Sequence, residues 1–109
     1  MIGGVGIDIV GIARVQESID YGDQALELVL KPEELDVPAP LIACELAAKE
    51  ALIKASDKGN HLDPLTLRVK KNSIGNYYFE FDDPAQKFNG FLSVSLSSDY
   101  ALAIVINLF

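Results

Sequence analysis

The sequence predicts a single α+β domain spanning residues 1–109, in which an antiparallel sheet packs on one long helix. The order of expected elements is one strand, then helices, then four strands, which is typical of a sheet with helices gathered on one face. A length of 109 residues, half of them hydrophobic, suits one domain with its own core. No repeat, linker or low-complexity tract divides the chain.

The first part of the chain is expected to form one strand followed by short helices. Residues 2–10 alternate small and β-branched side chains, and the glycines among them indicate that other groups approach the backbone closely. Residues 12–19 carry apolar side chains at helical spacing, and residues 24–30 are a second short helical candidate. Pro32 begins another turn, because proline is favoured at the first position of a helix.

Residues 41–58 form the clearest predicted helix, and Gly59 is its expected stop signal. Apolar side chains recur there at spacings of three and four and form one stripe, made of Leu41, Cys44, Ala48, Ala51, Leu52 and Ala55. The only cysteine, Cys44, falls on this stripe, so we expect a buried thiol and no intrachain disulfide.

The last part of the chain is expected to be four strands. Residues 65–71 alternate and form the first strand of a hairpin, and residues 77–81 return as its second strand after the turn at residues 73–76. Residues 91–96 and 101–108 form two further strands. The final strand is almost wholly apolar, and one sheet face of so small a domain cannot easily cover it, so we expect an assembly that buries apolar surface.

Charge and composition argue against several classes of partner. The net charge of −7 disfavours nucleic acid and anionic membranes, since both are bound through clustered Lys and Arg. Residues 100–106, the longest apolar stretch near the C-terminus, are too few to span a bilayer. The N-terminus lacks the basic segment and long apolar run of a signal peptide, and a single cysteine favours a reducing compartment, so we expect a cytoplasmic protein.

Three charged residues are candidates for chemistry. Asp8 lies inside an apolar strand, where a carboxylate is costly unless it is paired, hydrogen-bonded or bound to a metal; the alternative is a strand residue facing water. Glu50 and Lys54 lie four apart on one face of the long helix, and the alternative there is an exposed ion pair of little energetic consequence. Two carboxylates would suit Mg²⁺ beside a phosphate, and Lys54 would neutralise phosphate charge. The single histidine, His61, is expected in a surface loop.

Three segments carry a family resemblance. Residues 4–15 read GVGIDIVGIARV, residues 46–55 read LAAKEALIKA, and residues 94–103 read VSLSSDYALA. In this order they resemble the G-I-G-x-D opening, the F-A-A-K-E-A-x-x-K-A helix and the V-S-[IL]-[ST]-H…Y-A-x-A ending of holo-(acyl-carrier-protein) synthases, in the 4′-phosphopantetheinyl transferase superfamily. Residues 30–35, LKPEEL, resemble the turn before that family's second helix.

The resemblance implies the family's fold and its reaction, the Mg²⁺-dependent transfer of 4′-phosphopantetheine from coenzyme A to a serine of an acyl carrier protein, as in fatty acid biosynthesis. It implies that Asp8 and Glu50 bind the metal and that Glu50 helps to activate the serine. Lys54 would sit at the pyrophosphate and protonate the leaving group, and Arg14 would help to dock the carrier protein. Family members are typically homotrimers with active sites between subunits.

The sequence also departs from the family pattern. Ser98 stands where the family has histidine, beside Ser97, and both serines are expected near coenzyme A. Glu45 stands where the family has arginine, and we expect it near the phosphate site. These departures predict weak coenzyme A binding, which the double change Glu45→Arg with Ser98→His should tighten. They also support an alternative, a degenerate non-catalytic member that acts as a binding or assembly subunit.

Overall fold

The computed structural model describes residues 1–56 and 62–108 of the chain. In chain order its elements are β1 (Ile2–Gly11), α1 (Ile12–Asp20), a 3₁₀ turn (Gln24–Leu28), α2 (Pro32–Leu35), α3 (Ala39–Ala55), a second 3₁₀ turn (Pro64–Thr66), β2 (Leu67–Lys71), β3 (Tyr77–Phe81), β4 (Gly90–Leu96) and β5 (Tyr100–Leu108). The order of strands and helices matches the expected one. No helix within residues 1–56 and 62–108 is long and apolar enough to cross a bilayer.

The long helix differs from the expected one at both ends. It begins at Ala39, after the extended N-cap residue Pro38 (φ −61°, ψ 153°), and Pro40 lies in its first turn. It ends at Ala55, and Ser56 is extended, with φ −78° and ψ 153°. The expected continuation to residue 58 is therefore wrong, while Gly59 and His61 lie outside the described residues.

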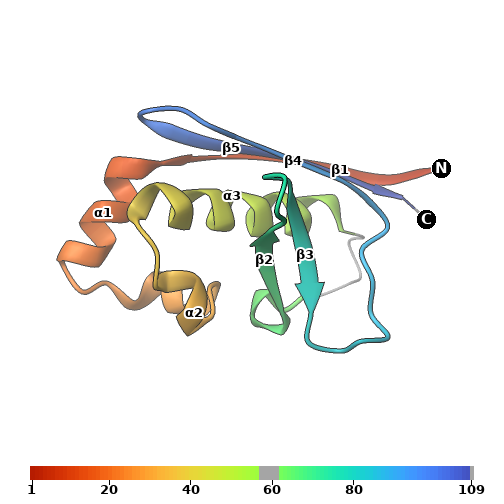
Figure 1. Ribbon diagram of the computed structural model, residues 1–109, viewed down its shortest axis with the longest axis horizontal. Coiled ribbons are helices and arrows are strands. Elements are labelled where there is room, and N and C mark those ends of the chain that lie inside the picture. The colour runs from red at the N-terminus through yellow and green to blue at the C-terminus, as the bar shows by residue number, and fades with distance from the viewer. Residues whose placement is uncertain (57–61, 109) are drawn as a thin grey trace.

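The strands form two separate sheets, with α3 between them (Figure 1). One sheet has three antiparallel strands in the order β1-β5-β4, and the other is the β2–β3 hairpin on the opposite side of the helix. The strands after α3 therefore do not all join one sheet. The physical reason is that α3 has buried side chains around most of its circumference, so it needs covering on more than one side.

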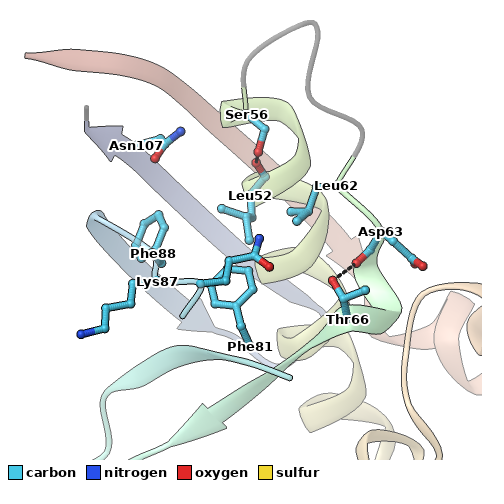
Figure 2. Close-up of a pocket in the computed structure, with 10 residues that line it drawn as sticks. Leu52, Ser56, Leu62, Asp63, Thr66, Phe81, Lys87, Phe88 and Asn107 are labelled. Atoms are coloured by element: carbon cyan, nitrogen blue, oxygen red, sulfur yellow. Dashed lines mark hydrogen bonds between the residues drawn. The ribbon is translucent and has the colours of Figure 1, made fainter. Parts of the chain in front are cut away.

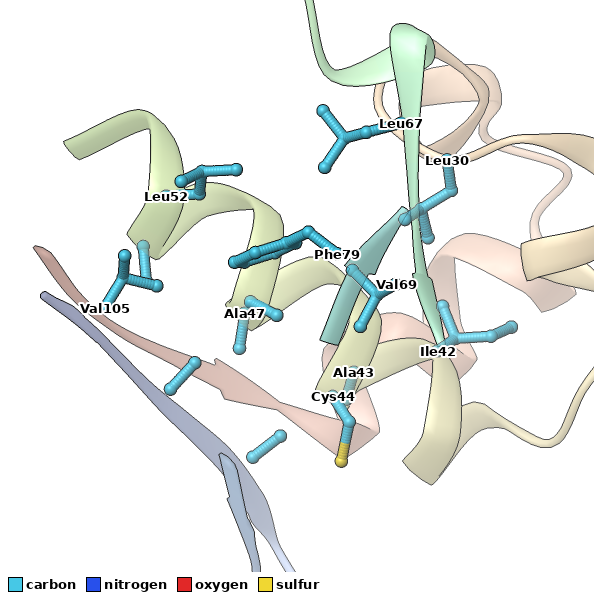
Figure 3. Packing of buried hydrophobic residues seen from close by; sticks show 14 of the residues in the cluster. Leu30, Ile42, Ala43, Cys44, Ala47, Leu52, Leu67, Val69, Phe79 and Val105 are labelled. Carbon is cyan, nitrogen blue, oxygen red and sulfur yellow. The ribbon is translucent and has the colours of Figure 1, made fainter. Parts of the chain in front are cut away.

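The hydrophobic core lies on both sides of α3 (Figure 3). Val105 of β5 packs on α3 from the three-stranded sheet, and Val69 of β2 and Phe79 of β3 cover the helix from the hairpin. Figure 3 also shows the thiol of Cys44 in this core, and the cysteine is buried as expected.

Two glycines of β1 allow α3 to lie unusually close to the strand. A Cβ added at Gly4 would lie 2.0 Å from the carbonyl oxygen of Ala55, and one added at Gly6 would lie 1.9 Å from that of Ala51. Only glycine fits such positions, because no real Cβ approaches a backbone oxygen so closely. Asp8 is two residues further along the same face of the strand, so its side chain also points toward α3.

The opposite face of the three-stranded sheet is apolar and uncovered. We call it the outer sheet face, and its exposed apolar members are Val5, Ile7, Ile9, Phe91 and Ile104. The alternate positions of β5 point to α3 and are fully buried, as expected for a strand with one covered face.

Candidate active site

The structure joins Asp8 of β1 to Lys54 of the last turn of α3. The ammonium of Lys54 donates hydrogen bonds to Asp8 Oδ1 at 2.8 Å and to the backbone carbonyl of Ile7 at 3.0 Å. The Asp8 side chain is 17% exposed and the Lys54 side chain 53% exposed, so the pair lies at the rim of the helix–strand contact. Asp8 therefore does not face bulk water alone, which was the alternative left open by strand alternation.

Glu50 lies one helical turn before Lys54 and completes this group, which we call the Asp8 cluster (Asp8, Glu50 and Lys54). Burial raises the pKa of the Glu50 carboxyl, the negative charge of Asp8 raises it further, and Lys54 opposes the rise. The three charges therefore act on one another, although they come from distant parts of the sequence. The structure brings together the three residues that the motifs singled out.

The donor set of the Asp8 cluster fits a hard divalent cation that is only partly held by protein. Two carboxylates are what Mg²⁺ commonly takes from a protein, with substrate phosphates and water completing its shell. Within the described residues, no group of three or more His, Cys, Asp or Glu side chains could hold a metal ion. A cation bound here would therefore take its remaining ligands from water or from a substrate phosphate.

Arg14 and Ser98 lie together, but away from the Asp8 cluster. They line an open hollow of about 930 Å³, which also includes Gly11 at the end of β1. Gly11 is three residues beyond Asp8, which is about 10 Å along a strand. One copy of the chain therefore does not bring Ser98 or Arg14 to the two carboxylates.

Ser97 lies neither in the Asp8 cluster nor in the hollow that Arg14 and Ser98 line. It lines an apolar hollow of about 410 Å³ with Ile9, Leu102 and Tyr100 on the outer side of the sheet. Its hydroxyl accepts a hydrogen bond from the backbone N–H of Tyr100 at 3.1 Å, which stabilises the turn between β4 and β5. Since Ile9 and Asp8 are adjacent in β1, they point to opposite faces, and Ser97 is not on the side of the cluster.

The expectation that Glu45 stands near the phosphate site needs correction. Its side chain is buried, with 9% exposed, and its Oε2 has no hydrogen-bond partner within the described part of the chain. The pKa of Glu45 is raised to about 8, mainly by burial and then by the charge of Glu34, while Lys49 opposes the rise. Glu45 therefore belongs to a buried group on the α2 side of the helix, and arginine there would place a second cation near Lys49.

That buried group contains an ion pair that the sequence analysis missed. Lys49 is 1% exposed and Glu34 3% exposed, and the Lys49 ammonium donates to Glu34 Oε1 at 2.6 Å. It also donates to the carbonyls of Val29, Pro64 and Leu67 at 2.8 to 2.9 Å. The pair ties α3 to α2 and β2. Lys49 lies about 100° around the helix from Ala48, outside the predicted apolar stripe, so helical spacing gave no signal of its burial.

A further cavity, of about 390 Å³, lies at the C-terminal end of α3 (Figure 2). Leu52 and Ser56 of the helix, with Phe81 and Phe88, form part of its wall. Lys54 lies midway between Leu52 and Ser56 in sequence, so it projects from the other side of the helix. The Ser56 hydroxyl donates a hydrogen bond to the Leu52 carbonyl at 2.8 Å, so its proton is engaged within the helix end. This cavity is separate from the Asp8 cluster.

Comparison with known proteins agrees with the resemblance seen in the motifs. Residues 4–105 match the family model of the 4′-phosphopantetheinyl transferase superfamily. The chain belongs to this superfamily, a family of transferases, and the expected α+β fold class is confirmed by the solved structures described next.

The similar proteins within the superfamily are holo-(acyl-carrier-protein) synthases. The one from Thermodesulfovibrio yellowstonii is 34% identical over 97% of this chain and 98% of that protein. The one from Azoarcus sp. is 32% identical over 97% of each chain. The crystal structure from Neisseria meningitidis has a TM-score of 0.79 and 28% identity, covering 100% of both chains. The Bacillus anthracis enzyme, solved in complex with CoA (3′,5′-ADP), has a TM-score of 0.78 and 26% identity, over 98% of this chain and 96% of that one.

Proposed function

We propose that this chain transfers 4′-phosphopantetheine from coenzyme A to a serine of an acyl carrier protein. The observation that carries the proposal is the convergence of Asp8, Glu50 and Lys54 at one helix–strand contact. A purely structural relic has little reason to retain two carboxylates and a lysine in this arrangement. Membership of the superfamily and similarity to full-length holo-(acyl-carrier-protein) synthases support the same reaction.

Each residue of the Asp8 cluster has a role in this reaction. Asp8 and Glu50 would hold Mg²⁺, which would supply positive charge beside the pyrophosphate of coenzyme A. Glu50 would also accept the proton of the attacking serine hydroxyl, directly or through a water molecule. The serine oxygen forms a bond to the phosphorus that carries pantetheine, and the bond from that phosphorus to 3′,5′-ADP breaks. Lys54 donates to the leaving phosphate oxygen.

We further propose that the working form is a homotrimer in the cytoplasm. The outer sheet face is uncovered in one copy, and large exposed apolar patches mark interaction surfaces. Ser97, Ser98 and Arg14 lie away from the Asp8 cluster within one chain, so a neighbouring copy is a natural source for the coenzyme A and carrier contacts. The buried, unpaired thiol of Cys44 suits a reducing compartment.

Arg14 is the residue proposed to contact the carrier protein. It lines the open hollow beside α1, where a partner has access to it. The chain carries a net charge of −7, and an acidic carrier would meet it with net repulsion. Arg14 therefore supplies a local attraction within an unfavourable overall field, and carrier binding should weaken when Arg14 is lost.

A non-catalytic binding or assembly subunit remains the second candidate, because Ser98 provides only a hydroxyl where the family has histidine. Under this alternative the chain would keep the fold and the outer sheet face but would not bind coenzyme A. Calorimetry with coenzyme A and Mg²⁺ distinguishes the two candidate functions. Weak but measurable binding of coenzyme A supports the transfer activity, and complete absence of binding supports the non-catalytic subunit.

The transfer reaction itself is tested by mass spectrometry of a panel of apo carrier proteins incubated with the chain, coenzyme A and Mg²⁺. At least one carrier should gain the mass of phosphopantetheine. Asp8→Asn should abolish the gain, whereas the matched change Asp36→Asn, at an exposed residue outside the Asp8 cluster, should not. No gain on any carrier, or an unchanged rate in Asp8→Asn, would reject the proposal.

A further inference from the structure

Lys54 already places a cation on the carboxylate that is proposed to bind the metal. Its ammonium lies 2.8 Å from Asp8 Oδ1 and 3.0 Å from the Ile7 carbonyl oxygen. Two of the three N–H donors of the ammonium are thus used, one by a carboxylate and one by a backbone oxygen of the same strand. Lys54 fills, in this arrangement, the electrostatic role that a divalent cation would have at Asp8.

The charges of the cluster explain why both cations cannot keep the same position. Asp8 and Glu50 carry two negative charges, and Lys54 offsets one of them. The Lys54 ammonium occupies Oδ1 of Asp8, so a divalent cation bound to the same carboxylate would lie close to it, and the two cations would repel each other. Metal binding is therefore opposed for as long as the ammonium stays on Oδ1.

Lys54 is well placed to leave. Its side chain is 53% exposed, whereas that of Asp8 is 17% exposed, so the mobile partner is the lysine. Exposed ion pairs of this kind are weak, because solvent screens them and a long side chain loses freedom in making them. Lysine also has a flexible stem, and it can carry its charge several ångströms without any movement of the helix.

We infer that Lys54 is a displaceable counter-ion of Asp8, which a divalent cation expels and which then binds the coenzyme A pyrophosphate, so that the cation and coenzyme A bind cooperatively. This inference rests on the proposed function of the Asp8 cluster. Without coenzyme A, the expelled ammonium gains no new partner and metal binding is opposed. With coenzyme A, the pyrophosphate accepts the ammonium, and the opposition disappears. By thermodynamic reciprocity, the metal strengthens coenzyme A binding by the same factor.

The sharpest test measures Mg²⁺ alone, without coenzyme A, by calorimetry on the intact chain. Lys54→Met keeps the length of the side chain and removes the competing charge. It should bind Mg²⁺ about three- to tenfold more tightly than the natural chain, which is the range expected for losing one weak ion pair and one repulsive charge. An equal or weaker affinity in Lys54→Met would overturn the inference.

The matched control is Lys70→Met. Lys70 forms a similarly exposed ion pair, 3.3 Å from Glu80, with 45% of its side chain exposed. This variant has the same change in net charge but should bind Mg²⁺ with unchanged affinity. Equal tightening in both variants would show a general charge effect and would overturn the specific role of Lys54. Asp8→Asn should abolish the difference between Lys54→Met and the natural chain, and persistence of the difference would place the metal elsewhere.

The cooperative part is tested by repeating the titrations with coenzyme A present. Coenzyme A should tighten Mg²⁺ binding in the natural chain, and this gain should be smaller in Lys54→Met; an equal gain in the two would overturn the coupling. The carrier-protein assay distinguishes failure of the counter-ion role from failure of the proposed transfer activity. If the natural chain modifies a carrier but Lys54→Met binds Mg²⁺ no more tightly, the counter-ion role fails and the enzyme stands. If Lys54→Met binds Mg²⁺ more tightly but the natural chain modifies no carrier, the counter-ion role stands and the proposed transfer activity fails.

Discussion

The buried carboxyl group of Glu45 should make the stability of the fold depend on pH. Burial is the main cause that raises the pKa of Glu45 to about 8, from an ordinary value of 4.5. The groups that face it are Glu34, which raises the pKa, and Lys49, which lowers it, and Glu45 in turn raises the pKa of Tyr77. Between pH 4.5 and about 8, the folded chain therefore holds a proton that the unfolded chain has released.

The sign of the effect follows from this difference in bound protons. The folded state binds more protons than the unfolded state over this range, so the free energy of unfolding falls as pH rises. The fall has an upper limit of about 1.4 kcal/mol for each pH unit, and relaxation around the buried group reduces it. Glu45→Gln keeps the shape of the side chain and removes its titration, so the free energy of unfolding of this variant should not show this fall as pH rises.

Thermal unfolding at pH 5.5 and pH 8.5 measures this effect. The two chains should have similar melting temperatures at pH 5.5, and Glu45→Gln should be more stable at pH 8.5 by at least about 1 kcal/mol, or roughly 5 °C. The control Glu27→Gln changes an exposed carboxylate and should follow the natural chain at both pH values. Parallel curves for Glu45→Gln and the natural chain would show that Glu45 is ionised and paired in solution, which contradicts the burial argument.

Three further changes test the packing and the assembly. Gly6→Ala should destabilise the fold by at least about 2 kcal/mol in urea unfolding, because its Cβ would collide with α3, whereas Gly11→Ala should cost little, since a Cβ there meets nothing closer than 3.8 Å; equal costs would refute the close approach. Lys49→Met should cost about 3–5 kcal/mol by leaving Glu34 buried without its partner, and a cost below about 1 kcal/mol would show that the pair is not buried in solution. Ile7→Lys, on the outer sheet face, should convert a trimer to a monomer in light scattering, and a natural chain that is itself monomeric at micromolar concentration would reject the trimer.

Local patterns predicted most of the elements of the fold. The turn at residues 73–76 and the strand that returns after it gave the bounds of β3, and the spacing of Cys44, Ala48 and Ala55 identified part of the buried surface of α3. These predictions succeed because backbone periodicity and side-chain burial depend on neighbouring residues. The division into two sheets was not predictable in this way, since it depends on what covers the far side of α3.

The residues of the candidate site could be predicted from the sequence, whereas the buried charges near them could not. Asp8, Glu50 and Lys54 stand out as charges in apolar or motif-bearing segments, and the structure brings them together. The burial of Glu45 and Lys49 was missed, because helical spacing alone does not tell whether α2 and β2 cover that side of the helix. A charged residue on a helix is expected to be exposed until a partner such as Glu34 is known.

The most direct test of the central claim is the position of a divalent cation in crystals of the chain grown with coenzyme A and Mn²⁺. Mn²⁺ takes the same oxygen ligands as Mg²⁺ and can be located by its anomalous scattering. We predict one anomalous peak between the carboxylates of Asp8 and Glu50, with the Lys54 ammonium withdrawn from Asp8 and in contact with a phosphate oxygen. A peak elsewhere in the molecule, or coenzyme A bound with Lys54 still paired to Asp8, would contradict the account.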